Sequence, residues 1–138
     1  MYLLDTNVVS EFRKSADNRM NQGVRCWAKE IFPELMFVSA ISILELEIGV
    51  LQIERRDKKQ GAILRKWLNK NVLPAFSERV LPVDLAVARR CAGLHVPNPK
   101  SERDAMIAAT AIEHQMTIVT RNASDFRHSG VKVFDPWI

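Results

Sequence analysis

The chain has 138 residues, of which 47 % are hydrophobic and 26 % are charged, and these fractions predict one globular domain spanning residues 1–138 rather than a disordered chain. The longest apolar runs, such as Ile48–Leu51, are too short for a transmembrane helix. The net charge of +4 is compatible with a polyanionic partner but does not by itself predict one.

Short β-favouring runs alternate with longer helical segments along the whole chain. The predicted strands are Met1–Leu4, Met36–Ser39, Val80–Val83, Thr117–Thr120 and Val131–Phe134. The predicted helices are Thr6–Arg13, Asn21–Phe32, Ile41–Arg56, Lys58–Leu73, Asp84–Leu94 and Glu102–His114. The fourth helix is expected to end at Leu73 because Pro74 follows it. The alternation predicts an α/β fold with a parallel sheet covered on both faces and a ligand site beyond the carboxyl ends of the strands.

The first residues, Met-Tyr-Leu-Leu-Asp, lack the basic start and the apolar stretch that are typical of a signal peptide. Cys26 and Cys91 lie in helix-like segments without the spacing of metal ligands. We expect both to be reduced thiols in the core, and we expect the protein to be cytoplasmic.

Acidic residues follow two of the predicted strands. Asp5 comes directly after the first strand and before a helix, so it could simply cap that helix. Asp125 lies in the turn after the fourth strand and could close an Asx-type turn. Each residue could equally be a ligand at the edge of the sheet, and the local sequence alone leaves both roles open.

Two further acids lie on predicted helices. A helical wheel places Glu45 within roughly 60° of Ile41 and Ile48, at the edge of an apolar face where an unpaired carboxylate is costly. Pairing with an arginine would be a structural alternative to a site there. Asp104 follows Ser101 at the spacing of a capping box, which is its structural alternative. The small residues after Asp104 would let its helix approach the sheet closely and bring this acid to the strand ends.

The combination of these acids is more informative than any one of them. The four carboxylates expected to converge are Asp5, Glu45, Asp104 and Asp125. Two unit charges about 4 Å apart repel by about 4 kcal/mol at an effective dielectric constant near 20, so such a cluster needs protons or a cation. Oxygen-only ligands favour Mg²⁺ or Mn²⁺. His95, His114 and His128 lack ligand spacing and are expected to be ordinary surface or cap residues.

Four segments carry these acids: Leu4–Asn7, Ser42–Gly49, Asp104–Ala111 and Thr120–Phe126. In this order and at these separations they resemble the PIN-domain ribonucleases, and specifically the VapC toxins of bacterial toxin–antitoxin pairs. The resemblance runs the whole length of the chain. The stretch Gln52–Pro82 is not diagnostic and could hold differences in substrate or partner specificity.

The resemblance implies a three-layer α/β/α PIN fold with a five-stranded parallel sheet, and Mg²⁺- or Mn²⁺-dependent cleavage of RNA. It maps the acidic quartet of the family onto Asp5, Glu45, Asp104 and Asp125. It places four small polar residues near the metal: Thr6, Asn7, Thr120 and Asn122. It also implies inhibition by a small VapB-type antitoxin, and homodimers that join antitoxins in larger complexes.

The expected chemistry is hydrolysis of a phosphodiester by a metal-bound water. Asp5, Glu45 and Asp104 are the expected principal ligands, and Asp125 is the expected outer or second-metal ligand. Two basic residues flank the acids and are candidates for gripping the RNA backbone: Arg103 and Arg121. The helices Ile41–Arg56 and Lys58–Leu73 are expected to form a hairpin with surplus apolar surface. We expect an antitoxin segment to dock in a groove beside the acids and to bring a basic side chain to them.

Two other functions were weighed against a ribonuclease. A dehalogenase-like phosphatase would have a second aspartate where Asn7 stands, and a receiver-like domain would need an acid pair ahead of a mid-chain phosphorylated aspartate. The sequence has neither. A non-catalytic binding module could contact RNA through the basic run Arg55–Lys59, although a solvated turn is the commoner role of such a run. Loss of RNA cleavage in EDTA would distinguish the nuclease from the module.

Overall fold

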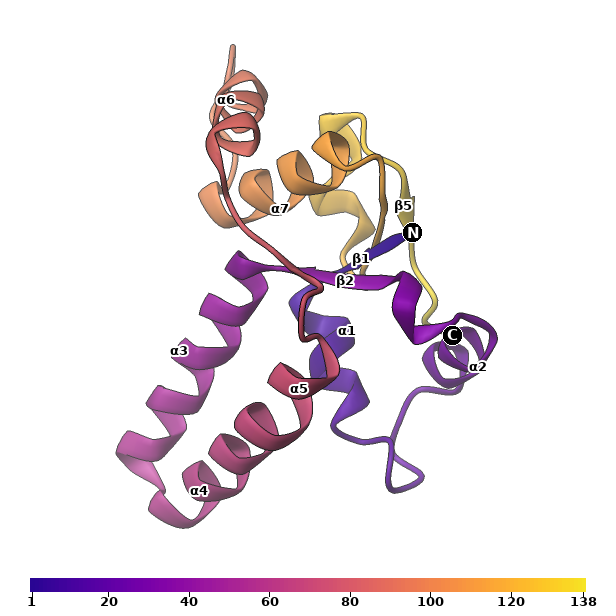
Figure 1. The fold of residues 1–138 in the computed structure, drawn as a ribbon, viewed down its shortest axis with the longest axis vertical. Coiled ribbons are helices and arrows are strands. Elements are labelled where there is room, and N and C mark those ends of the chain that lie inside the picture. Colours follow the sequence, from indigo (N-terminus) through magenta and orange to yellow (C-terminus); the bar gives the residue numbers. More distant parts are fainter.

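Five short strands form one all-parallel sheet at the centre of the molecule, in the order β3-β2-β1-β4-β5 (Figure 1). The computed structural model describes residues 1–138. The strands are β1 (Tyr2–Leu4), β2 (Met36–Ser39), β3 (Val80–Leu81), β4 (Thr117–Val119) and β5 (Val133–Phe134). The predicted parallel sheet is confirmed, and all strands but β2 are one or two residues shorter than expected.

The register of the three central strands brings their ends to one edge of the sheet. Leu4 of β1 lies level with Val38 of β2 and with Val119 of β4. The N–H of Asp5 then donates to the carbonyl of Val119 at 2.9 Å. Asp5 and Thr120, which follow β1 and β4, therefore lie side by side at the carboxyl edge of the sheet, where α/β sheets place their ligand sites.

Helices cover both faces of this sheet. They are α1 (Thr6–Phe12), α2 (Gln22–Glu30), α3 (Ala40–Arg56), α4 (Lys58–Trp67), α5 (Leu73–Ala75), α6 (Leu85–Leu94) and α7 (Glu102–Glu113). Leu4 and Val119 belong to the core that includes residues of α1 and α3, whereas Leu3 and Ile118 pack with α7 on the other face. The predicted three-layer arrangement is confirmed. Helix α6 packs on the outer side of α7 (Figure 1).

Buried alanines bring α7 close to the sheet. Ala105, Ala108, Ala109 and Ala111 are all at most 3 % exposed, and Ala108 and Ala111 share a core with strand residues. Ile107 is also fully buried in this core, but a helix whose buried positions are mostly alanines can lie nearer to a sheet than one with larger side chains. The first turn of α7, which holds Asp104, is placed by this packing.

The predicted end of the fourth helix at Leu73 is wrong. The chain is α-helical to Trp67, π-helical from Leu68 to Val72, and α-helical again through Pro74 in α5. The N–H of Leu73 donates to the carbonyl of Leu68, five residues back, so the turn before the proline is wider than an α-turn. Pro74 then stands in the first turn of α5, a position where proline is tolerated.

The prediction for the cysteines is half right. Both thiols are free, and Cys91 is buried between α6 and α7 as expected. Cys26 is exposed, because it lies on the outer face of α2 while Val24 and Trp27 take the inner positions. None of the helices has the length and apolar character that a membrane span requires.

Candidate active site

Asp5 is both a helix cap and a member of an acidic site. Only 7 % of the residue is exposed. Its Oδ1 accepts the N–H of Thr6 at 2.8 Å, which is the capping bond, and its Oδ2 accepts the hydroxyl of Thr120 at 2.7 Å. Burial raises the pKa of Asp5 in spite of these bonds, and the charges of Glu45 and Asp125 raise it further. The two explanations offered by the sequence are therefore compatible.

Glu45 reaches the site from the second turn of α3. The hydroxyl of Thr6 donates to Glu45 Oε1 at 2.6 Å, and Arg103 Nη1 lies 3.7 Å from Glu45 Oε2. The arginine pairing considered as an alternative thus exists, and Glu45 still lines the same cavity as Asp5. Thr6 ties the two carboxylates together, because its backbone N–H holds one and its hydroxyl holds the other.

Asp104 lies half-buried in the first turn of α7. The capping box that was the structural alternative for this residue does not form, because the side chain of Ser101 makes no capping bond. Burial raises the pKa of Asp104, and repulsion from Asp5, Asp125 and Glu45 adds to the effect. The other three acids are therefore near enough to act on this carboxylate through space.

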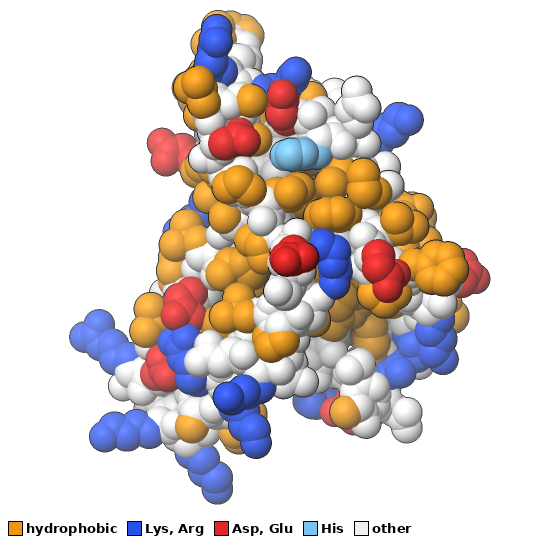
Figure 2. All heavy atoms as spheres, viewed as in Figure 1, with side chains coloured by type: hydrophobic (Ala, Val, Ile, Leu, Met, Phe, Trp, Pro, Cys, Tyr) orange, Lys and Arg blue, Asp and Glu red, His pale blue; other side chains and the backbone are white.

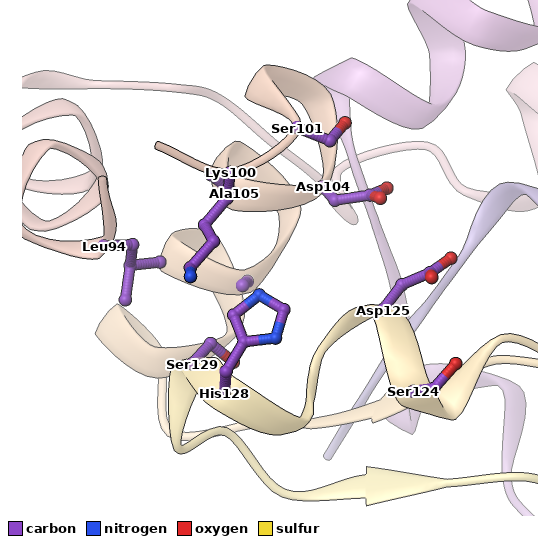
Figure 3. Close-up of a pocket in the computed structure, with 10 residues that line it drawn as sticks. Leu94, Lys100, Ser101, Asp104, Ala105, Ser124, Asp125, His128 and Ser129 are labelled. Atoms are coloured by element: carbon purple, nitrogen blue, oxygen red, sulfur yellow. The ribbon is translucent and has the colours of Figure 1, made fainter. Parts of the chain in front are cut away.

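Asp125 is the exposed member of the group. It ends the short 3₁₀ turn Ala123–Asp125 that follows β4, and its backbone N–H donates to the carbonyl of Asn122 at 3.0 Å. Its carboxylate accepts no hydrogen bond in the structure, so it does not close an Asx turn by its side chain. Figure 3 shows Asp104 and Asp125 projecting in the same general direction from their two elements.

Thr120 connects the small polar residues behind Asp5. Its fully buried hydroxyl donates to Asp5 and accepts Nδ2 of Asn7 at 3.3 Å and the N–H of Asn122 at 3.0 Å. Asn7 Oδ1 in turn accepts the N–H of Arg121 at 3.3 Å. The network fixes the orientation of the Asp5 carboxylate and joins the ends of β1 and β4.

The four acids line one cavity of about 450 Å³, which we call the acidic cavity. The predicted Thr6, Asn7, Arg121 and Asn122 also line it. The sequence analysis did not single out its other lining residues: Ser10, Glu11, Arg13, Lys14 and Trp137. Ser10 and Arg13 lie four and seven positions after Thr6, so a helical pattern starting at Thr6 would have found them. No comparable signal marks Trp137.

A basic rim lines one part of this cavity. It consists of Arg13, Lys14 and Arg121. The guanidinium of Arg121 lies 5.7 Å from the ring centroid of Trp137, within cation–π range. Glu11 is a structural acid: burial opposes its charge, but bonds from the Asn21 N–H and from Lys14 outweigh that effect and lower its pKa.

The donor set fits a hydrated hard cation better than a fully enclosed ion. Every candidate ligand is a carboxylate or hydroxyl oxygen, and the raised pKa values of Asp5 and Asp104 indicate a site short of positive charge. No three acidic, histidine or cysteine side chains are arranged as a ready-made ligand shell. Mg²⁺ usually keeps several waters and uses one or two carboxylates directly, so a shared cavity of this kind can hold it.

Comparison with known proteins decides the family. A family model described as the PIN domain matches residues 2–131. The chain belongs to the PIN domain family. The resemblance noted in the sequence is thereby confirmed at the level of the family.

The similarity to known members extends over the whole chain. It is 36 % identical to the toxin FitB of Neisseria gonorrhoeae, with 99 % of both chains covered. It is 35 % identical to the VapC ribonuclease Y4jK of Sinorhizobium fredii, covering 99 % of this chain and 98 % of the other. The crystal structure of FitAcB from Neisseria gonorrhoeae matches with a TM-score of 0.88 at 34 % identity, covering 99 % of each chain. The predicted fold of this family is confirmed.

Proposed function

We propose that this PIN-domain protein is a metal-dependent endoribonuclease that hydrolyses RNA phosphodiester bonds at the acidic cavity. The observation that carries the proposal is the meeting of four carboxylates from β1, α3, α7 and the turn after β4 around one cavity. Burial raises the pKa of two of them, Asp5 and Asp104, and repulsion between the acids adds to the effect. A relative of similar length is named a VapC ribonuclease, which agrees with this chemistry.

The carboxylates hold the ion and take up a proton. Asp5, Glu45 and Asp104 are the proposed principal ligands, and the exposed Asp125 completes the shell directly or through water. Mg²⁺ or Mn²⁺, when bound, supplies a water of lowered pKa and neutralises the phosphate oxygens. Thr120 and Thr6 keep Asp5 in place for this task through their bonds to its two oxygens.

The basic rim is the proposed contact for the RNA backbone. Arg13, Lys14 and Arg121 line the same cavity as the acids, so they can bind phosphates near the one being cut. Trp137 holds the guanidinium of Arg121 at the edge of the cavity. Arg103 pairs with Glu45, so we propose that it steadies this acid as well as contacting RNA.

The run Arg55–Lys59 is less suited to the substrate. It comprises the last two residues of α3, Asp57 and the first two residues of α4, all exposed, and Figure 2 shows basic side chains spread at this end of the hairpin. Arg55 is ten residues beyond Glu45 on α3, which is about 15 Å along the helix. We therefore infer that this run is a solvated segment outside the site where RNA is cut.

We propose that a VapB-type antitoxin segment occupies the groove between α1, α3 and α4. The groove measures about 320 Å³ and begins at Thr6 and Glu45, beside the acidic cavity. Its apolar residues are Leu46, Val50, Ile53, Leu64 and Trp67. An amphipathic helix would place its apolar face on them and bring a basic side chain to Glu45. FitB, a relative, is named a toxin, which agrees with such a partner.

Assembly and location complete the proposal. Leu44 and Leu51 of α3 are 45 % and 54 % exposed, and we propose that exposed apolar residues of this kind are covered in a homodimer that joins antitoxins in a larger complex. The free thiols of Cys26 and Cys91 suit a reducing compartment, so we propose that the protein acts in the cytoplasm.

The direct test incubates the purified protein with a pool of single-stranded RNA. Cleavage is expected in millimolar Mg²⁺ or Mn²⁺ and should stop in EDTA. Cleavage that EDTA leaves undiminished would overturn the metal mechanism. Binding of the pool without any cleavage in either metal would instead support a non-catalytic module. Expression from its native operon tests the partner, because purification as a lone chain would argue against the antitoxin.

A further inference from the structure

A second cavity, of about 240 Å³, lies beside the acidic cavity and shares Asp104 and Asp125 with it. One wall is the start of α7, and the other is the segment from Ser124 to Ser129 (Figure 3). Only three of its ten lining residues are hydrophobic, so an apolar ligand would not suit it. It is also smaller than the roughly 300–1,000 Å³ of typical small-molecule sites, which favours part of a polymer.

Lys100 and His128 supply the basic groups of this cavity. They come from opposite walls and point toward one another, whereas Asp104 and Asp125 project away from them (Figure 3). Neither basic side chain makes an ion pair or a hydrogen bond within the protein, although two carboxylates border the same cavity. The backbone N–H of Lys100 donates to Nδ1 of His95 at 3.1 Å, which anchors Lys100 ahead of α7. The Lys100 ammonium and the His128 imidazole are therefore both available to an anion.

Hydroxyl groups add donors around the same space. They belong to Ser101 and Ser124, whereas the hydroxyl of Ser129 already donates to the carbonyl of Phe126. Ser101 stands at the N-cap position of α7, and its side chain is not used for capping. The first N–H groups of this twelve-residue helix begin there, and a helix N-terminus favours a negative ligand. A lysine, a histidine and hydroxyl donors in a small polar cavity are the groups that recognise a phosphate.

We propose that this cavity, the Lys100–His128 pocket, binds a backbone phosphate of single-stranded RNA next to the phosphate that is hydrolysed. The proposal rests on the ribonuclease function proposed above. The pocket and the basic rim lie on the two sides of Asp104 and Asp125, so an RNA backbone held at both crosses the acids between them. Cations on both sides offset the repulsion that an acidic centre exerts on a polyanion. Lys100 and His128 are thus substrate-positioning residues.

Binding is measured first, without relying on cleavage. The Asp5→Asn protein in millimolar Mg²⁺ serves as a background for fluorescence anisotropy with a labelled single-stranded RNA of random sequence, twelve nucleotides or so long. Lys100→Gln and His128→Gln should each weaken binding several-fold. The slope of log K against log salt should fall by about 0.7 for one lost phosphate contact. The control is Lys132→Gln, which removes an exposed lysine outside both cavities.

Melting temperatures close to that of the background protein would show that the variants are folded. Unchanged affinity and unchanged salt slope in both Lys100→Gln and His128→Gln would overturn the proposal. An equal loss in Lys132→Gln would also overturn it, because the effect would then be one of net charge rather than of this pocket.

Kinetics then locates the contact. In an RNA with one cleavage site, single phosphates are replaced in turn by neutral methylphosphonates. With wild-type protein, one replacement beside the cleavage site should raise KM and leave kcat nearly unchanged. With the Lys100→Gln protein, the same replacement should no longer raise KM. Cleavage with the same methylphosphonate profile in both proteins would overturn the pocket alone. A wild-type protein that cuts no RNA would overturn the proposed function, and the binding experiment would still test whether the pocket binds RNA.

Discussion

Replacing Asp5 by asparagine separates a capping residue from a member of a charged site. Asparagine caps helices nearly as well as aspartate, so the bond from the Thr6 N–H is kept. The hydroxyl of Thr120 loses its acceptor, since it already accepts from Asn7 and Asn122, and one such bond contributes about 0.5–1.5 kcal/mol. The loss of a buried charge beside Glu45 acts in the opposite direction. In EDTA we therefore expect the free energy of unfolding of the Asp5→Asn protein to lie within about 1 kcal/mol of the wild-type value.

Metal should separate the two proteins. A ligand that binds only the folded state at 100 times its Kd stabilises by about 2.7 kcal/mol. Wild type should gain stability of this order in saturating Mg²⁺ or Mn²⁺, and the Asp5→Asn protein should lose most of that gain. Thermal melts of both proteins in EDTA and in each metal provide the comparison, with Asp5→Ala as the variant that also removes the cap. An equal metal-induced shift in wild type and Asp5→Asn would refute the assignment of Asp5 as a ligand.

Three further predictions concern the pH dependence of stability, the hydroxyl of Thr120 and the packing of Gly23. Burial raises the pKa of Asp5 and Asp104 in the folded state, so in metal-free protein these groups stabilise the fold below their unfolded pKa, and this stability is lost as the pH rises through the folded pKa. An unfolded aspartate has a pKa of about 3.9, so in EDTA the melting temperature of Asp5→Asn should rise relative to that of wild type from about pH 4 upward. Thr120→Val removes the hydroxyl that orients Asp5 and should lower activity or metal affinity by about 10–100-fold, measured by Mg²⁺ titration of cleavage; an unchanged titration would contradict the orienting role. Gly23→Ala would push a methyl group into the backbone carbonyl of Pro136 and should lower the free energy of unfolding, measured by chemical denaturation, by about 1–3 kcal/mol. An unchanged free energy of unfolding would show that the C-terminal segment moves to make room for the methyl group.

The main outline of the fold and the acids of the site could both be predicted from the sequence, because the signals for both are found in short stretches of the chain. Strand and helix periods are local, and the carboxyl ends of parallel strands must share an edge, so Asp5 and the turn after β4 had to lie at the same edge of the sheet; their direct proximity comes from the pairing of β1 with β4. Glu45 was detectable because a carboxylate at the edge of an apolar helix face needs a partner. These signals depend only on chain direction and side-chain polarity.

What the sequence could not provide depends on packing between distant segments. Lys100 and His128 meet only because the turn after β4 lies against the start of α7, and no periodicity links them. Pro74 was expected to end a helix, but a π-turn before it widened the backbone enough to accommodate it. Ser101 has the spacing of a capping box, yet its hydroxyl remains outside the bond that the pattern predicts.

The central claim is that the four carboxylates of the acidic cavity hold a metal ion that hydrolyses RNA. The most direct measurement is the initial rate of cleavage of one single-stranded RNA as Mg²⁺ is titrated from an EDTA-treated start, for wild type and for Asp104→Asn. We predict a wild-type rate that rises from zero and saturates, and an Asp104→Asn rate lower by orders of magnitude in a protein that melts as a folded one. Equal rates in the two proteins, or a wild-type rate independent of Mg²⁺, would contradict the claim.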